Sequence, residues 1–346
     1  MSAKSTHPRK PDRSRGYRLA FPCRVGARVQ VRAVSCGVDL QRVYAHESWL
    51  SIEHAGLALE LPLVALMRPG PCAVALSVCP DSWSVPAAWK GPLEGPLADL
   101  RANPGRHDGM LTALIDLRTA EGTYVGQVAP VSYFATRALE SLLDGVHALR
   151  HCDQPREGRL PEPSESVMAC DIGVVVLLKT SDDIVVAQRR AGHLDWRAGH
   201  LSVSASGSLE PARDFDSPVV GLDGLLAGAR RELAEELGVG GVHDPCADQL
   251  QMTSLGIWRE LERGGKPELY AAASTPLSFQ EVCMLHARAP DASESDTLHG
   301  LARADRERLL ADVIEADGLL QRSDGPVDLA LVAALLLSRD AAHGRS

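Results

Sequence analysis

The sequence predicts an α/β fold, a mixed sheet flanked by helices, preceded by a strand-rich α+β segment. After residue 167, short aliphatic runs alternate with longer segments of helical periodicity, an order that packs helices onto a sheet. Before residue 150, short apolar runs bounded by proline and glycine are typical of strands. With 346 residues and 45% apolar side chains, the chain is long enough to form two cores.

The first half of the chain divides into a tail, a domain and a linker. Residues 1–16 are basic and contain proline and serine, and no apolar segment follows, so we expect a disordered tail rather than a signal peptide. Residues 17–150 are expected to form a strand-rich N-terminal domain of unknown role. Residues 151–166 hold three prolines and many charges, which predicts a linker. The expected elements are strands at Arg28–Val34, Ala73–Val78 and Leu111–Asp116 and a helix at Ala135–Leu149.

The second domain is expected to span residues 167–340. Two aliphatic strands joined by Lys-Thr-Ser-Asp-Asp predict a hairpin, and Leu-Ser-Val-Ser-Ala-Ser has the alternation of a third strand. A second strand pair turns at Arg263-Gly264-Gly265-Lys266, and two helices follow. The expected elements are strands at Gly173–Leu178, Asp183–Gln188, Leu201–Ser206, Leu255–Arg259 and Glu268–Ala273 and helices at Ala302–Ile314 and Pro326–Ser338.

Between these strand groups, residues 231–239 read Arg-Glu-Leu-Ala-Glu-Glu-Leu-Gly-Val. On a helix, Glu232, Glu235 and Glu236 fall within an arc of roughly 100°. A stripe beside them has the spacing of a buried face, formed by Leu226, Ala229, Leu233 and Leu237. Clustered carboxylates repel one another unless a cation lies between them, and such oxygen ligands suit Mg²⁺ or Mn²⁺. The segment therefore predicts a divalent-metal site.

The same segment resembles the second half of the Nudix box, Gly-x5-Glu-x7-Arg-Glu-U-x-Glu-Glu-x-Gly-U, where U is aliphatic. The matching residues are Arg231, Glu232, Leu233, Glu235, Glu236, Gly238 and Val239. The resemblance covers residues 168–340 and implies an α/β/α sandwich with hydrolase activity. The alternative is an ordinary charged helix that ends at the C′ glycine Gly238.

The first half of the box departs from the pattern. Asp223 stands where the pattern has glutamate, and Ser217 stands where it has glycine. Gly207 is the better candidate glycine, which implies a loop insertion of about ten residues within 211–221. We expect Asp223 near the helix start, where it caps the helix. In the family this position supports the box arginine, and the shorter aspartate puts that support in doubt.

The resemblance implies roles for these side chains. Glu232 and Glu236 are the expected metal ligands, with Glu235 completing the cluster or binding a second ion. Arg231 is expected to orient Glu235 or Asp223 through a charge-assisted bond. The general base is left open among these acids and a loop acid. The loop candidates, which otherwise are solvated strand-turn residues, are Glu260, Glu262 and Glu268.

Several other residues have two readings. Arg189 or Arg190 ends a strand near where substrate phosphates are expected and could pair with phosphate oxygens, although a surface strand end is the commoner explanation. Trp196, between His193 and His200, either stacks on a base or anchors a loop, and the loop anchor is the commoner case. His107-Asp108 lacks a nucleophile elbow, and the glycines of 221–228 precede no Lys-Ser or Lys-Thr, so neither a triad nor a P-loop is predicted.

Composition limits the class of protein. The net charge of −9 argues against nucleic-acid binding through bulk charge. No apolar run approaches the 18 residues that a membrane span needs. The eight cysteines are scattered, without the spacing of a zinc site, so free thiols and a cytoplasmic location are expected. A homodimer is a candidate assembly.

The Nudix resemblance implies hydrolysis, dependent on Mg²⁺ or Mn²⁺, of the pyrophosphate bond in a nucleoside diphosphate linked to another moiety. Thr123–Thr136 and the sequence Leu-Gly-Ile-Trp-Arg-Glu are similar to segments of a two-domain Nudix branch that acts on UDP-sugars. That similarity implies a UDP-sugar or an ADP-ribose-like substrate. The alternative function is a Nudix-fold nucleotide sensor or regulator with little turnover.

Overall fold

The computed structural model describes residues 28–32, 38–70, 72–144, 149–152, 158–194, 196–322 and 325–342. The predicted tail (1–16) lies outside the described residues. So do the beginning of the predicted N-terminal domain, the end of the predicted strand at 28–34 and the middle of the predicted linker.

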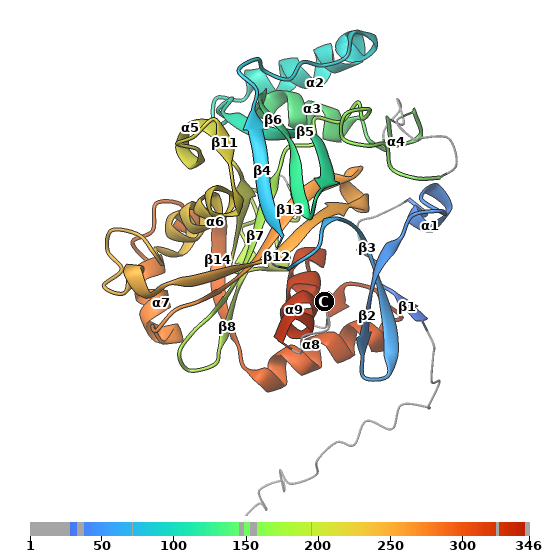
Figure 1. Cartoon of the computed structure of the whole chain (residues 1–346). Coiled ribbons are helices and arrows are strands. Elements are labelled where there is room, and N and C mark those ends of the chain that lie inside the picture. Colours follow the sequence, from blue (N-terminus) through green and yellow to red (C-terminus); the bar gives the residue numbers. More distant parts are fainter. Residues whose placement is uncertain are drawn as a thin grey trace, which may run out of the picture.

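A mixed ten-stranded sheet runs through the described part of the chain and confirms the predicted α/β class (Figure 1). Its main path is β1-β3-β12-β13-β7-β8-β14, and β2, β10 and β9 pair with β3, β7 and β8. The β1–β3 and β13–β7 pairs are parallel, and the other pairs of this sheet are antiparallel. The strands are β1 (Arg28–Gln30), β2 (Trp49–His54), β3 (Leu57–Met67), β7 (Gly173–Lys179), β8 (Val185–Arg190), β9 (Leu201–Ser202), β10 (Ala205–Ser208), β12 (Gln251–Glu260), β13 (Lys266–Ser274) and β14 (Ser295–Leu301).

Helices cover both faces of this sheet, which makes the α/β/α sandwich (Figure 1). Side chains alternate along β7, so Val174, Val176 and Leu178 face α6 (Leu222–Leu237). Val175 and Leu177 share the opposite core with the last two helices. Besides the short α5 (Pro211–Asp214), this half contains the helices α7 (Phe279–His286), α8 (Arg303–Glu315) and α9 (Leu329–Ala342). The two predicted C-terminal helices are thereby confirmed. No described helix is long and apolar enough to cross a membrane.

The first half of the chain is not separate from this sheet. The hairpin of β2 and β3 joins it, and β3 pairs with β12, so the predicted linker at 151–166 is not a boundary of the sheet. A second sheet has the order β11-β4-β6-β5. Its strands are β4 (Ala73–Val78), β5 (Met110–Ala120), β6 (Thr123–Ser132) and β11 (Val219–Val220). The strands predicted at 73–78 and 111–116 are confirmed, whereas the division into domains at 17–150 and 167–340 stays a prediction.

The helix predicted at Ala135–Leu149 is shorter than expected. Helix α3 spans Tyr133–Ser141, where the Ser132 side chain accepts a hydrogen bond from the Ala135 amide and caps the first turn. The amides of Leu142 and Leu143 close tight turns onto carbonyls three residues earlier, which ends the helix. Part of the predicted helix, residues 145–148, lies outside the described residues. The other short helices of this half are α1 (Leu40–Val43), α2 (Lys90–Ala102) and α4 (Leu149–Cys152).

The strand predicted at Leu201–Ser206 is broken in two. β7 and β8 pair at Lys179 and Val185 and then diverge, so β9 pairs with β8 and β10 pairs with β7. Ser204 bridges the gap, because its hydroxyl accepts from the Leu178 amide and donates to the Val186 carbonyl. The short antiparallel pair of β15 (Gln321–Arg322) and β16 (Gly325–Pro326) completes the strands. The divergence brings β10 beside α6, where the motif acids lie.

Candidate active site

Helix α6 buries the predicted apolar stripe and turns two of its three motif acids inward. Leu226, Ala229, Leu233 and Leu237 lie in the core, as the spacing indicated. Glu232 is 9% exposed and Glu236 is 2% exposed, so neither extends into bulk solvent. Gly238 follows the helix with φ of 74°, a left-handed conformation that favours glycine, and its amide donates to Ala234. The local pattern of residues 226–238 is confirmed.

Glu236 lies against neutral hydrogen-bond donors. The Ser206 amide of β10 donates to one carboxylate oxygen at 2.7 Å, and the Gln188 side-chain amide of β8 donates to the other. Burial, reinforced by the negative charge of Glu232, raises the pKa of Glu236 to about 8. A buried carboxylate held only by neutral donors is an incompletely compensated negative charge.

Glu232 lies one turn earlier, over β10. Its carboxylate accepts from the Ser208 amide at 3.2 Å and from Arg231 Nη1 at 3.0 Å. Burial, together with the charge of Glu235, raises its pKa to about 7 although Arg231 opposes the shift. A Cβ at Gly207 would lie 2.1 Å from Glu232 Oε1, so only glycine lets this carboxylate rest on the strand. This close approach supports Gly207 as the box glycine.

Arg231 is held by Asp214 rather than by Asp223. Its guanidinium makes a two-point contact with Asp214, Nε to Oδ1 at 2.7 Å and Nη2 to Oδ2 at 3.0 Å. Asp223 is exposed in the first turn of α6, whose N-cap is Gly221 without a side-chain cap bond. The predicted capping and supporting roles of Asp223 are therefore wrong.

The physical reason is the place of the inserted residues. Asp214 ends the short helix α5 (Pro211–Asp214), which begins soon after Gly207. The extra residues follow Asp214, and within them β11 pairs with β4 of the smaller sheet. Ser217 is an exposed residue of this loop. The inserted residues therefore lie between Asp214 and α6, and not between Gly207 and Asp214.

Glu235 is the third motif acid and is paired with two arginines. Arg231 Nη1 lies 2.9 Å from Glu235 Oε2, which confirms the predicted charge-assisted bond. Arg213 of α5 donates to the other oxygen. Arg231 thereby contacts Asp214, Glu232 and Glu235 together. Its position fits the orienting role expected from the resemblance.

A cleft of about 750 Å³ opens beside these acids. One wall comes from α6 and β10, and another comes from the front of the chain, with Arg106, Tyr133 and Arg137. The arginines that line it are Arg106, Arg137, Arg190, Arg213, Arg231 and Arg263. The acids that line it are Asp171, Glu210, Glu232, Glu235, Asp291 and Glu294. The cleft is therefore lined by both cations and carboxylates and is large enough for a nucleotide-sized ligand.

At the end of β8, the arginine that reaches the cleft is Arg190. It donates to the Ser206 hydroxyl and to the Trp196 carbonyl, each at 3.1 Å. Arg189 donates to the Gly199 carbonyl at 2.8 Å and is not among the described residues that line the cleft. Successive side chains of a strand point to opposite faces, so only one of the pair faces this space. Arg189 is thus the wrong choice for the predicted phosphate contact.

Trp196 anchors the loop before β9, as the commoner reading predicted. The guanidinium carbons of Arg197 and Arg263 each lie 5.1 Å from its ring centroid. His193 lines the cleft, whereas His200 contacts the Ala198 carbonyl and does not line it. Trp196 also lines the cleft, so the anchored ring is one of its walls.

The candidate loop bases are buried in a charge network, and the expectation that they are solvated is wrong. Arg197 contacts Glu260 and Glu262 together with Asp328. Glu268 lies 2.9 Å from Arg263 Nη1 and 3.1 Å from Lys266 Nζ. Because each of these carboxylates contacts a cation, none is placed as a free base. Part of this network lines a smaller cavity of about 150 Å³ that shares Arg190 and Trp196 with the cleft.

Two acids that the sequence did not single out lie close to the motif. Asp291 and Glu294 line the cleft, and the Asp291 amide donates to the Glu235 carbonyl at 2.9 Å. Burial raises the pKa of Glu294, and its charge in turn raises the pKa values of Glu232 and Glu236. Neither acid belongs to a local motif, and the packing of α7 and the segment after it against α6 brings these acids to the site.

The donor set suits a hard divalent cation. Glu232, Glu235 and Glu236 supply carboxylate oxygens, and the raised pKa values of Glu232 and Glu236 show that protein cations compensate their charge incompletely. Among the described residues, no group of three or more His, Cys, Asp or Glu side chains is arranged to hold a metal ion. The three glutamates have the oxygen ligands that such a cation prefers, and in this structure their oxygens accept hydrogen bonds from protein donors.

No family model matches the chain, and no curated protein matches it. Among solved structures, a MutT protein from Methanosarcina mazei is 14% identical, with 51% of this chain and 96% of that chain covered and a TM-score of 0.27. A Nudix hydrolase from M. smegmatis, RenU, is 13% identical, with coverages of 51% and 86% and a TM-score of 0.26. A Deinococcus radiodurans protein is 16% identical, with coverages of 49% and 82% and a TM-score of 0.31. Two of these names belong to the family that residues 231–239 resemble, but similarities this low carry no information on substrate or metal.

Proposed function

We propose that this chain is a Nudix-type pyrophosphohydrolase that requires Mg²⁺ or Mn²⁺. Its substrate is a nucleoside diphosphate linked to another moiety, of the UDP-sugar or ADP-ribose-like class. The products are a nucleoside monophosphate and a phosphorylated partner. The chain then acts on small molecules rather than on nucleic acid, in keeping with its net charge of −9.

The observation that carries the proposal is the buried pair of Glu232 and Glu236. Desolvation and the charges of neighbouring acids raise both pKa values, so a bound divalent cation would relieve repulsion that the protein leaves in place. Burying two acids in this way is unfavourable in a purely structural helix. Glu232 also lines the arginine-rich cleft, where an anionic substrate would lie, and Glu236 lies buried one turn further along α6.

The residues in and beside the cleft would have different roles. Glu232 and Glu236 would hold the metal ion, with Glu235 completing the cluster when it releases an arginine. The bound ion would supply charge screening and a more acidic water. Arg231, which Asp214 holds in place, would orient the side chains of Glu232 and Glu235. Arg190 and Arg263 face the same space and would bind phosphate oxygens.

The test is turnover with a panel of substrates. We expect the protein with Mg²⁺ or Mn²⁺ to release nucleoside monophosphate from nucleotide-sugars or ADP-ribose, as detected by chromatography. Glu236→Gln should lower kcat by at least about a thousandfold, because an amide is a poor ligand for a hard cation. Glu315→Gln changes an exposed glutamate of α8 and serves as the matched control. Turnover that survives Glu236→Gln removes the assigned metal role.

A second candidate is a nucleotide sensor with little turnover. The observation that favours it is Glu235, whose two oxygens are paired with Arg213 and Arg231 and are not free for a metal. Saturable binding of a nucleotide-sugar without product would support the sensor. Product formation that depends on metal would exclude it.

A further inference from the structure

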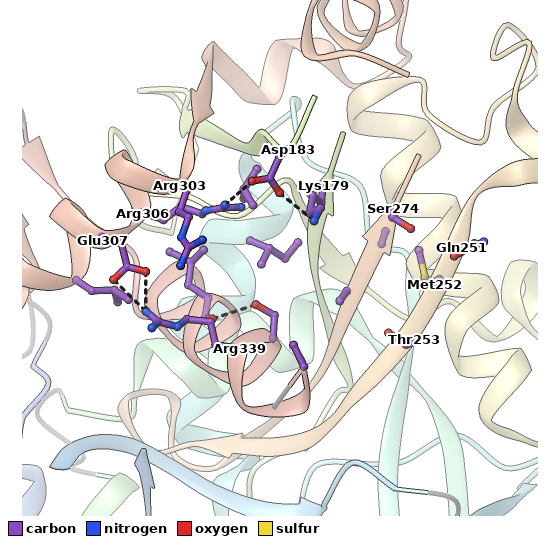
Figure 2. Close-up of a pocket in the computed structure, with 18 residues that line it drawn as sticks. Lys179, Asp183, Gln251, Met252, Thr253, Ser274, Arg303, Arg306, Glu307 and Arg339 are labelled. Atoms are coloured by element: carbon purple, nitrogen blue, oxygen red, sulfur yellow. Dashed lines mark hydrogen bonds and ion pairs between the residues drawn. The ribbon is translucent and has the colours of Figure 1, made fainter. Parts of the chain in front are cut away.

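A second pocket, of about 620 Å³, lies on the face of the sheet opposite to α6 (Figure 2). Its floor is made by Leu177, Val185, Leu310 and Leu335, which belong to the core formed with α8 and α9. It is also distant from the cleft along the sheet. Asp171 lines the cleft and Lys179 lines this pocket, a separation of roughly 26 Å along a strand at about 3.3 Å per residue.

The pocket carries an excess of positive charge. Its basic side chains are Lys179, Arg303, Arg306 and Arg339, and its acids are Asp183 and Glu307. Lys179 lies 2.9 Å and Arg306 lies 3.3 Å from Asp183, and Arg339 lies 3.1 Å from Glu307. Arg303 has no ion-pair partner among the described residues. Two acids facing four bases leave a surplus of two positive charges for an anion to offset.

The opposite side of the pocket is polar but uncharged. Figure 2 shows Gln251, Thr253 and Ser274 gathered across from the charged side chains, beside Met252. An amide and two hydroxyls both donate and accept hydrogen bonds, which suits a sugar hydroxyl or the edge of a heterocycle. The apolar floor lies between the two sides. The volume is within the usual range for sites that take ligands of nucleotide size.

We propose that this pocket binds a small phosphorylated organic molecule, a nucleoside monophosphate or a sugar phosphate. The phosphate lies against Arg303 and Arg306, and the organic part extends over the floor to Gln251, Thr253 and Ser274. An aliphatic carboxylate fits less well, because its chain would cover these polar groups without bonding them. The proposal goes beyond the proposed function, since it concerns a different face of the sheet.

The experiment is calorimetric titration of the full chain in EDTA with four probes: adenosine 5′-monophosphate, glucose 6-phosphate, adenosine and octanoate. At least one phosphate ester is expected to bind saturably and more tightly than adenosine or octanoate. Arg303→Gln removes the cation without an ion-pair partner, so it should weaken that binding about tenfold to a hundredfold without breaking an ion pair. Arg306→Gln should weaken it to a similar degree.

Two variants locate the binding. Arg308→Gln removes an exposed arginine of α8 that does not line the pocket, and it should bind like the unaltered chain. Glu236→Gln disables the proposed metal site and should also leave the binding unchanged, so the two proposals fail separately. The proposal is overturned if neither phosphate ester binds, if octanoate binds more tightly, or if Arg303→Gln has no effect. Loss of binding in Glu236→Gln would place the ligand in the cleft and would equally overturn it.

Discussion

The edge of α6 and the network around Arg197 both bury carboxylates, and they differ in what those carboxylates contact. In the network, Glu260, Glu262 and Asp328 each contact the Arg197 guanidinium. At the edge of α6, Glu236 contacts one backbone amide and one side-chain amide. Burial tends to raise the pKa of the carboxyl groups in both places. At Asp328, the Arg197 cation reverses that shift.

The pKa values express this difference. Burial alone would raise the pKa of Asp328, yet Arg197 lowers it below the usual value. Burial raises the pKa of Glu236 to about 8, and the negative charge of Glu232 adds to the shift. A buried acid without a paired cation is available to bind one. Among the motif acids this describes Glu236, whereas Glu232 and Glu235 already contact Arg231.

The largest expected effect comes from removing the cation of the network. Arg197→Met leaves three buried carboxylates without their shared partner, which should lower the free energy of unfolding by about 3–5 kcal/mol. Chemical denaturation measures it. Arg308→Met, at an exposed position of α8, should change the free energy by less than about 0.5 kcal/mol. Equal stabilities of the two variants would show that the network acids do not need Arg197.

The next effect concerns pH at the edge of α6. The pKa values of Glu232 and Glu236 are raised from 4.5 to about 7 and about 8, so the folded chain keeps protons that the unfolded chain loses. Without metal, the free energy of unfolding should therefore fall as pH rises from about 4.5 to about 8, by on the order of several kcal/mol. Glu236→Gln carries no charge and should flatten much of this decline. Denaturation at a series of pH values in EDTA measures it, and a slope that Glu236→Gln leaves intact would contradict the assignment.

Metal addition should oppose that decline. Mn²⁺ or Mg²⁺ at a hundred times its dissociation constant should raise the free energy of unfolding by about 2.7 kcal/mol, because only the folded chain gathers the acids. At a fixed metal concentration, the gain should be larger at pH 8 than at pH 5, where protons compete for the same oxygens and weaken metal binding. Thermal denaturation with and without metal measures the gain. Glu236→Gln should lose most of it, and an equal gain in that variant would contradict a site at α6.

The smallest effect separates the two aspartates near Arg231. Asp214→Asn weakens a buried two-point ion pair and should lower the free energy of unfolding by about 1–3 kcal/mol. It should also lower kcat, because Arg231 then positions Glu232 less firmly. Asp223→Asn, at an exposed site, should change both quantities little. The reverse ranking of the two variants would restore Asp223 as the supporting acid.

Much of the candidate site follows from local sequence. The spacing of the apolar residues and acids from 226 to 237 fixes which side of α6 is buried, since every residue of a helix turns by about 100°. Gly207 and Gly238 were likewise identified from the box pattern, and both have a steric or conformational reason to be glycine. The strands at β4, β7, β12 and β13 follow from their apolar runs and turn residues.

Other parts of the site depend on where separate segments meet. Nothing in residues 208–223 distinguishes Asp214 from Asp223 until β11 pairs with β4 and takes up the inserted residues. Whether Arg189 or Arg190 reaches the cleft depends on the register of β8, and a shift of one residue exchanges them. Asp291 and Glu294 join the site because the segment between α7 and β14 contacts α6 and the end of β8.

The sequence by itself determined the α/β class, the helix with its acidic edge and the glycines that let the chain pass close to it. The class and the helix depend on contacts between residues a few positions apart, which helical and strand periodicity encode directly, whereas the glycines follow from the box pattern. Only the tertiary structure decided which acids are left without a cation, because burial and charge pairing are sums over neighbours from the whole chain. Glu260 and Glu236 are the same residue type, and the presence of Arg197 beside one of them makes the difference.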